Sequence, residues 1–342
     1  MLTKKRKLGQ HHTKQDYQLY VVLPLIFNER KCKMLNDKFF QKRYVVVILA
    51  TAVALLWGSA YPCVKIGYSL FNVSDTNIFS KILYAGVRFS LAGIIALVLS
   101  VILNKKLIFP HKKSIGYIGL LGFFQTFLQY ILFYVGIFHT TGVKSAILIS
   151  TSYVVFMVLL SLIFFKKEKM SYKKSIGCIL GLSGAVIALT ADGGIDFSFT
   201  MTNEGCIMLS SLFFAMGSVI SKKVPSEIDS VSLNGWQLLF GGIGLTVVGI
   251  IGGGSIMPSG VSSFVLMFYM AVISSFGFVI WMLLLRYNPT EEVTVFNLLV
   301  PIIGTILSGL VLGEEFVNLS NFLALICVCL GIYVVNSRQR KE

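Results

Sequence analysis

The chain of 342 residues is 55% hydrophobic and only 13% charged, and its mean hydropathy is +0.79. Soluble domains are about 45–50% apolar and about 25% charged, so this composition excludes a soluble protein and predicts an all-α integral membrane protein. The net charge of +15 would suit a nucleic-acid ligand, but no basic face is interleaved with exposed aromatic residues, so we expect no nucleic-acid binding.

Residues 1–43 form a basic segment ahead of the first long apolar run. They contain one short apolar stretch, 17–27, which cannot span a bilayer, and no small-residue cleavage site follows it. We therefore expect a basic cytoplasmic extension. Met34 is a candidate alternative start because a short basic flank and the first span follow it directly, and an interfacial anchor is the rival interpretation of the apolar stretch.

From residue 44 onwards, ten apolar segments are each long enough to cross about 30 Å of hydrocarbon. They form two groups of five, at 44–191 and 203–336, so a shared fold requires the second group to be inverted relative to the first. The expected transmembrane helices are 44–68, 78–103, 114–137, 141–165, 173–191, 203–221, 231–253, 261–286, 292–313 and 319–336.

Segments rich in Lys and Arg alternate along the chain with loops that contain none. With the N-terminus inside, the outer loops 69–77, 192–202, 254–260 and 314–318 contain no Lys or Arg. All but four of the 30 Lys and Arg then lie in inner segments, which is the cytoplasmic bias of membrane proteins. We therefore expect a multi-pass protein of the cell (plasma or inner) membrane with both termini in the cytoplasm.

The two groups align with each other at an offset of about 147–157 residues. The basic residues that follow the fourth span are absent after the ninth, as an inverted copy requires. We expect ten transmembrane helices as two inverted five-helix repeats. The matched positions, first group before second, are Trp57 and Phe214, Lys65 and Lys222, Tyr153 and Pro301, Glu168 and Glu315, and Gly184 and Gly331.

Several motifs in both groups together resemble one transporter family. They are Leu56-Trp57-Gly58-Ser59-Ala60-Tyr61, Val87-Arg88-Phe89 and the Gly-rich 177–181 in the first group, and Glu204-Gly205, Pro301 and Leu312-Gly313-Glu314 in the second. The chain resembles the EamA family of the drug/metabolite transporter superfamily over residues 44–336. This resemblance implies two inverted EamA repeats and export or exchange of small metabolites. Tyr153 stands where the family usually has proline, so the sequence does not decide whether the fourth span is kinked.

Acidic residues are absent from the interior of the expected spans, apart from Glu204 and Glu292 at helix mouths. Proton- and cation-coupled carriers commonly place a carboxylate or histidine inside the membrane. We therefore favour a neutral, zwitterionic or amphipathic organic solute, for example an amino-acid-like one. Six cysteines form no CxxC pair and four histidines lack partner spacing, so we expect no metal and no cofactor.

Four basic residues lie inside the spans: Lys65, Lys81, Arg88 and Lys144. The lysines are close enough to span ends to reach the interface. Arg88 lies about ten residues into the second span, where a charge costs about 2.5–3.5 kcal/mol. It is either a structural clamp that binds backbone carbonyls of a neighbouring segment or a contact for a substrate carboxylate.

Polar and aromatic side chains within the spans are candidates for a pocket. Gln125 and Gln129 are four residues apart and so share a helix face, which cannot face lipid. This face either forms interhelical hydrogen bonds or forms the wall of a pocket, and the sequence is compatible with both roles. The candidate substrate-binding residues are Trp57, Gln125, Gln129, Tyr130, Ser152, Tyr153, Trp281 and Asn297. The candidate structural or gating residues are Pro62, Lys65, Arg88 and Pro301.

Two of these candidates are prolines inside expected spans. Proline lacks a backbone N–H donor and therefore leaves the carbonyl four residues earlier without its helical hydrogen bond. Pro301 frees the carbonyl of Asn297, and Pro62 frees that of Gly58 beside Trp57. Each place is a hinge or a binding notch.

These observations predict a secondary transporter that exports or exchanges a small organic metabolite by alternating access. A passive channel or facilitator for a small uncharged solute is the alternative. A membrane-embedded lipid-modifying enzyme would need clustered Asp, His or Cys at a membrane face, which the sequence lacks, so we expect no enzyme. The expected partners are a small-molecule substrate and membrane lipid. Gly177-x-x-x-Gly181 suits close helix packing and also a homodimer contact.

Overall fold

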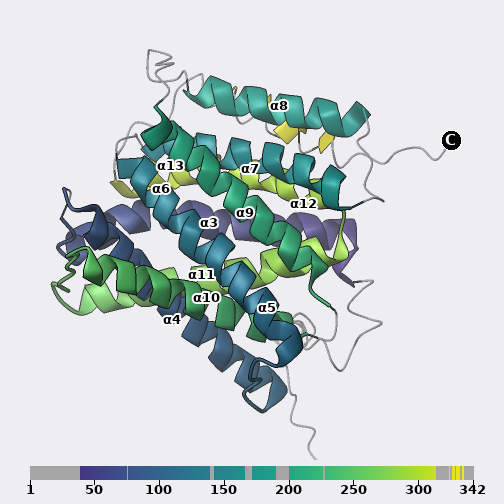
Figure 1. The fold of residues 1–342 in the computed structure, drawn as a ribbon. Coiled ribbons are helices and arrows are strands. Elements are labelled where there is room, and N and C mark those ends of the chain that lie inside the picture. Colours follow the sequence, from purple (N-terminus) through teal and green to yellow (C-terminus); the bar gives the residue numbers. More distant parts are fainter. Residues whose placement is uncertain are drawn as a thin grey trace, which may run out of the picture.

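The computed structural model describes residues 39–74, 76–138, 142–165, 172–189, 200–225 and 228–312, with a few residues between 323 and 334. All regular secondary structure in these residues is helical (Figure 1). The N-terminal group comprises α3 (Arg43–Leu70), α4 (Ile78–Asn104), α5 (Lys112–Leu121), η1 (Gly122–Leu128), α6 (Gln129–Phe138), α7 (Gly142–Phe164) and α8 (Tyr172–Leu189). The C-terminal group comprises η2 (Met201–Gly205), α9 (Cys206–Lys223), α10 (Ser230–Ile251), α11 (Val261–Tyr287), α12 (Thr290–Thr294), η3 (Val295–Leu298) and α13 (Leu299–Leu312).

Seven segments of the described residues are long and apolar enough to cross a membrane, and shorter apolar helices occur at Leu148–Phe164 and Ser175–Gly184. This confirms an all-helical protein with multiple membrane spans. The seven are Arg43–Leu70, Ile78–Asn104, Lys112–Ile137, Met201–Lys223, Ser230–Ile251, Val261–Tyr287 and Glu292–Leu312. Met34, Glu168, Glu314, Glu315, the loop 191–199 and most of the expected tenth span lie outside the described residues.

The distribution of polar and apolar side chains in the bundle is the reverse of that in a soluble protein. Large apolar side chains such as Ile102, Ile163 and Leu310 are exposed on its surface, whereas Arg88 and Gln125 are among the buried polar ones. Hydrocarbon solvates the apolar side chains, and polar groups must find partners inside the protein. The pattern places lipid around the bundle and hydrogen bonding within it.

Two expected helices contain irregular turns. The expected third span, 114–137, contains the π-helical segment η1, and the side chains of Gln125 and Gln129 are both buried. The ninth contains the 3₁₀ segment η3, where the backbone N–H of Leu299 donates to the carbonyls of Phe296 and Asn297. It lies directly before Pro301, which lacks a backbone N–H. α7, by contrast, continues as one helix through Tyr153.

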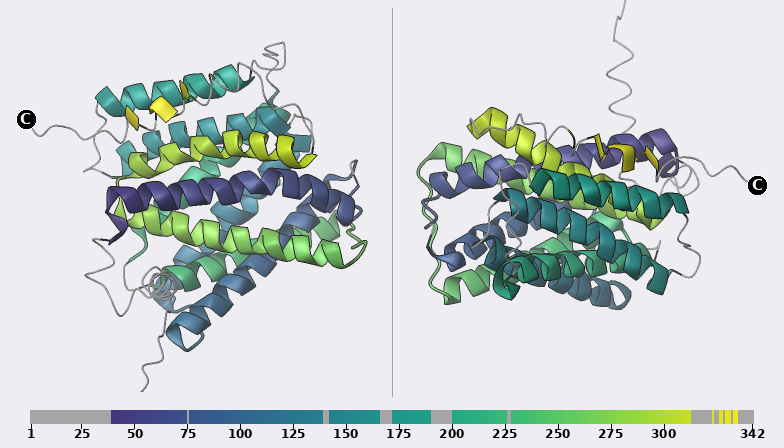
Figure 2. Two further views of the ribbon diagram at one scale, coloured as in Figure 1. Left: turned by 180° about the vertical axis from the view of Figure 1, so that it is seen from behind. Right: turned by 90° about the horizontal axis from the view of Figure 1, so that it is seen from above.

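The main helix packing joins the two groups to each other. α4 packs along α10, α3 lies against α13 and α11, and α9 lies against α6 and α7, as both figures of the ribbon show (Figures 1 and 2). At Gly242 of α10 the α4 backbone approaches so closely that an added Cβ would lie 2.4 Å from the nitrogen of Ser90. The core therefore lies between the groups, and α8 lies at the edge of the bundle (Figure 1).

The two ends of the bundle differ in charge. At one end, which we call the basic end, lie residues 39–43, 105–113, 222–225 and 228–230 and the last turn of α11, with Arg286. At the opposite end, loop 71–77 binds loop 252–260: the backbone N–H groups of Met257 and Ser259 donate to carbonyls of Phe71 and Leu70 at 2.8 and 2.9 Å. The two described end loops there contain no Lys or Arg.

Candidate substrate-binding site

Five aromatic rings from both helix groups meet in the core; we call them the central aromatic cluster. Its members are Trp57 (α3), Tyr153 (α7), Phe214 (α9), Phe278 and Trp281 (α11). The ring centroid of Trp57 lies 5.3 Å from that of Trp281, 5.6 Å from Phe278 and 5.9 Å from Phe214. The structure thus brings together three predicted site residues, Trp57, Tyr153 and Trp281.

A chain of hydrogen bonds fixes this cluster across three helices. The indole N–H of Trp281 donates to the Tyr153 hydroxyl at 3.1 Å, and that hydroxyl lies 3.1 Å from the Ser218 hydroxyl. Ser218 donates its own hydrogen to the carbonyl of Phe214 at 3.0 Å, so Tyr153 is the donor to Ser218. Every polar group in the chain is satisfied, which holds α7, α9 and α11 in one register.

Arg88 is buried between α4 and α11 with 7% of its surface exposed. Its Nε and Nη2 atoms both donate to the hydroxyl of Ser274, at 3.1 and 3.0 Å, and its guanidinium lies 4.6 Å from the ring centroid of Phe89. The acceptor is therefore a hydroxyl of the other helix group and not a backbone carbonyl. No carboxylate of the described residues forms an ion pair with Arg88.

Four tyrosines lie in the core near Arg88: the rings of Tyr68 and Tyr84 are 5.4 Å apart, and those of Tyr130 and Tyr134 are 6.4 Å apart. Tyr68 and Tyr134 are hydrogen-bonded to each other. Tyr130 packs on Phe89 with ring centroids 4.2 Å apart. The hydroxyl of Tyr84 is fully buried and has no hydrogen-bond partner. Phe278 lies 6.5 Å from Phe89 and so connects these residues to the central aromatic cluster.

A buried polar seam crosses η1, α10 and α11. The Thr126 hydroxyl donates to Gln237 Oε1 at 2.8 Å, Gln237 Nε2 donates to Asn234 Oδ1 at 3.0 Å, and Asn234 Nδ2 donates to the carbonyl of Ser275 at 3.4 Å. The π-turn of η1 sets Thr126 in this seam. Because a chain of amides satisfies itself here, the seam is helix-packing structure.

The remaining predicted site residues are buried but do not join the cluster. Gln125 packs against Gly217 of α9, and the Oε1 atom of Gln129 has no hydrogen-bond partner. Ser152 and Asn297 are each 6% exposed, and no hydrogen bond among the described residues joins them to the aromatic rings. Of the predicted structural or gating positions, Pro62 and Pro301 are buried, whereas Lys65 is exposed near the end of α3.

At the basic end, a second network joins helices of both groups. Lys222 Nζ donates to the carbonyl of Asn288 at 3.0 Å and to the Thr290 hydroxyl at 2.8 Å, and it lies 4.8 Å from the ring centroid of Phe165. Asn288 Nδ2 donates to the carbonyl of Phe40 at 3.1 Å. We call these five residues the basic-end network. It links α9, α12, the ends of α7 and α11, and the residues ahead of α3.

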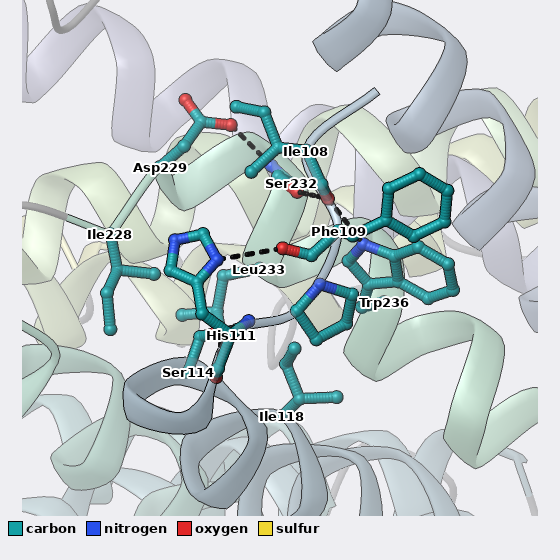
Figure 3. Close-up of a pocket in the computed structure, with 11 residues that line it drawn as sticks. Ile108, Phe109, His111, Ser114, Ile118, Ile228, Asp229, Ser232, Leu233 and Trp236 are labelled. Atoms are coloured by element: carbon teal, nitrogen blue, oxygen red, sulfur yellow. Dashed lines mark hydrogen bonds between the residues drawn. The ribbon is translucent and has the colours of Figure 1, made fainter. Parts of the chain in front are cut away.

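A small pocket also lies at the basic end, between loop 105–111 and α10 (Figure 3). The carbonyl of Ile108 accepts hydrogen bonds from the Ser232 hydroxyl at 3.1 Å and from the Trp236 indole at 2.9 Å, as Figure 3 shows. Asp229 Oδ2 accepts from the backbone N–H of Ser232 at 2.8 Å and caps α10. The pocket volume is about 10 Å³, the space of one water, so it cannot hold a metabolite.

Sequence reasoning missed Phe214, Phe278 and Ser218 as partners of the cluster. One signal was present for Phe214, because it is the repeat match of Trp57 and the two rings are now in contact. Matched positions of an inverted repeat face each other across the axis that relates the two copies. Phe278 carries no such signal, since one more phenylalanine in an apolar helix is indistinguishable from core.

The EamA-like transporter family model matches the chain twice, at residues 45–190 and 203–337. The chain belongs to this family. Among its EamA relatives is "Uncharacterized transporter YoaV" of Bacillus subtilis (strain 168), which is 24% identical over 305 residues, 84% of this chain and 96% of the relative. A "Probable amino-acid metabolite efflux pump" of Escherichia coli (strain K12) is 25% identical over 297 residues, 84% of this chain and 93% of the relative.

One solved crystal structure has the same fold as this EamA chain. It superposes with a TM-score of 0.68 at 15% identity and covers 85% of this chain and 97% of the other. Membership of a transporter family implies a membrane-embedded protein with a small-molecule substrate and agrees with the expectation that the chain is not an enzyme.

Proposed function

We propose that the protein is a secondary transporter that exports or exchanges a small organic metabolite, amino-acid-like or amphipathic, across the plasma membrane. Residues 44–191 and 203–336 act as two inverted five-helix repeats, ten helices in all, with both termini in the cytoplasm. The halves rock against each other by alternating access around a site at the central aromatic cluster. The relative named as an amino-acid metabolite efflux pump supports the solute class and the direction.

Reciprocal helix packing supports the inverted repeat. Under the sequence alignment, α3 corresponds to α9, α4 to α10, α5–α6 to α11, and α7 to α12–α13. The contact of α3 with α13 then corresponds to that of α9 with α7, and the contact of α3 with α11 to that of α9 with α6 and η1. All four contacts are present, and the α4–α10 pair corresponds to itself. Two unrelated halves would have no reason to pack in matched pairs.

The single observation that carries the transport site is the composition of the central aromatic cluster. Its rings come from α3 and α7 of one half and from α9 and α11 of the other, so any rocking of the halves changes the cluster itself. Aromatic rings offer apolar surface for part of a solute, and the neighbouring Arg88, Gln129 and Tyr130 offer polar contacts. A site built across a moving interface is what alternating access requires.

The basic-end network supports a conformation that is closed on the cytoplasmic side. With both termini inside, the basic end faces the cytoplasm, as the bias of Lys and Arg requires. Rocking of the halves at this end would break the contacts that join them there, namely the hydrogen bond from Asn288 Nδ2 to the carbonyl of Phe40 and the cation–π contact of Lys222 with Phe165.

Transport in proteoliposomes tests the proposal, with the solute taken from metabolite profiling of overexpressing and deletion cells. We expect saturable uptake and counterflow of an accumulated solute. Replacing Trp281 by alanine should lower the rate at least tenfold, because it removes a ring of the cluster and the donor to Tyr153. The matched control is Trp236→Phe at the small basic-end pocket, which should transport at nearly the normal rate.

The contrary result is flux that rises linearly with solute concentration and shows no counterflow. It would identify a passive channel and overturn the proposal. Equal rates for Trp281→Ala and Trp236→Phe would instead move the site away from the central aromatic cluster.

A further inference from the structure

We propose that Arg88, with the hydroxyls of Tyr84 and Tyr130, forms a subsite that binds the carboxylate of the transported solute. This inference rests on the proposed transport function and names the chemical group that the site recognises. It also chooses between the two roles that the sequence left open for Arg88.

The first argument is the unused hydrogen-bonding capacity of Arg88. Guanidinium has five N–H donors, and here two of them converge on the single hydroxyl of Ser274. No acceptor among the described residues engages the others. Ser274 donates its own hydrogen to the carbonyl of Met270 at 2.9 Å, so it is already fully used. A structural clamp would distribute the donors over several carbonyls, whereas this arrangement leaves a face of the fork available for a ligand.

The second argument is charge. The Arg88 side chain carries a guanidinium group and is only 7% exposed, yet no carboxylate of the described residues neutralises it. A buried cation without a counter-ion is expensive in a membrane protein, and such residues face a functional cavity or pathway. The cation–π contact with Phe89 offsets only part of this cost. A solute anion would supply the missing charge.

The third argument is the set of donors around the guanidinium. A phenol hydroxyl donates a hydrogen bond as readily as it accepts one. Tyr84 lies one helical turn from Arg88 on α4, and its buried hydroxyl has no partner. Tyr130 stacks on Phe89 directly beside Arg88. Two carboxylate oxygens offer about four acceptor positions, which the guanidinium fork and two phenols would occupy.

The rest of the solute would lie against aromatic surface. Phe89 and Phe278 connect Arg88 to the central aromatic cluster, with ring centroids 6.5 Å apart. A carboxylate at Arg88 would therefore place its attached group toward Trp57, which lies 5.6 Å from Phe278. An aromatic monocarboxylate is a suitable probe for this geometry.

A matched pair of probes tests the subsite: sodium phenylacetate and phenylacetamide, which have nearly the same shape and differ in charge. Binding to the purified full-length protein is followed through tryptophan fluorescence, because two of the three tryptophans belong to the cluster. We expect the wild type to bind phenylacetate saturably and at least about tenfold more tightly than phenylacetamide, since charge-assisted hydrogen bonds are the stronger ones.

Variants assign this preference to Arg88 and Tyr84. Arg88→Gln should reduce the affinity ratio of the two probes to near one, whereas Arg88→Lys should keep part of it, because lysine retains the charge without the fork. Tyr84→Phe should lower the ratio several-fold while leaving the fold intact, since its hydroxyl bonds nothing in the protein. Lys106→Gln, which removes an exposed charge beyond α4, should leave the ratio unchanged.

The ratio separates a binding role from a structural one. Damage to folding would weaken both probes together and leave their ratio as in the wild type. An unchanged ratio in Arg88→Gln and Tyr84→Phe, a wild-type ratio near one, or no saturable phenylacetate binding would overturn the subsite. Normal counterflow by Arg88→Gln of a solute that carries a carboxylate would also overturn it, while leaving the transporter proposal intact.

Discussion

Tyr153 and Pro301 occupy matching positions of the two halves and have opposite structural effects. The phenol of Tyr153 accepts from Trp281 and donates to Ser218, and α7 continues through it without a break. Pro301 cannot donate a backbone hydrogen bond and follows the 3₁₀ turn of η3. The backbone therefore differs at the two matching positions: α7 stays regular through Tyr153, whereas a 3₁₀ turn precedes Pro301.

At the residue scale, Tyr153→Phe should destabilise the protein although it removes a single oxygen atom. The indole N–H of Trp281 would remain buried without an acceptor, which costs about 1–3 kcal/mol. We expect a lower midpoint of thermal unfolding in detergent and altered tryptophan fluorescence. Tyr172→Phe is the control, because its side chain is 82% exposed, and it should unfold like the wild type. Equal unfolding midpoints for the two variants would refute the role assigned to the chain of hydrogen bonds.

Helix elements gain their close packing from small residues and their irregularity from π and 3₁₀ turns. α4 and α10 form the most extensive pairing of the described helices, and glycines let their backbones meet. In lipid, where apolar side chains gain little from leaving the solvent, such close backbone contact is a main source of helix association. The π segment η1 places Thr126 beside Gln237, which adds a buried hydrogen bond to the same interface. Packing and hydrogen bonding thus reinforce one another along α10.

At the element scale, Gly242→Ala should weaken the α4–α10 pair. The new Cβ would lie 2.4 Å from the Ser90 nitrogen, so the backbones would have to separate at a cost of about 1–3 kcal/mol. Gly119→Ala introduces the same methyl group on α5, where nothing lies within 4 Å, and serves as the control. Thermal unfolding in detergent should show a clear drop for the first variant and none for the second. The reverse order would show that the two helices tolerate a wider separation.

Over the whole molecule, charge and hydrogen bonding distinguish the two ends of the bundle. The basic end carries the Lys222 and Arg286 contacts, and Arg286 Nη2 donates to the carbonyl of Pro225 at 3.1 Å. The opposite end is held by backbone hydrogen bonds between two loops that contain no Lys or Arg. A membrane potential and the anionic inner leaflet both favour basic residues on the cytoplasmic side. The two ends therefore support the proposed orientation, with the basic end in the cytoplasm.

At the scale of the whole molecule, single cysteines should report opposite orientations for the two ends. In a variant without the six native cysteines, Lys106→Cys should react with a membrane-impermeant maleimide only after cells are permeabilised. Met257→Cys, in the exposed loop after α10, should react in intact cells. Labelling of both positions from one side would contradict the inverted arrangement, and exchanged labelling would reverse the proposed orientation.

Span length and the distribution of apolar residues by themselves determined the membrane class and seven of the spans, because each depends on local composition, and a set of short motifs indicated the family. The choice of partners was decided only in three dimensions. Gln125 and Gln129 were expected in the same site as Trp57 and Trp281, yet only the two tryptophan rings are in contact, whereas Gln125 packs against Gly217 of α9. Arg88 was recognisable as costly from its position, but its acceptor, Ser274, is 186 residues away along the chain. Contacts between helices depend on packing of distant segments, which no local pattern encodes.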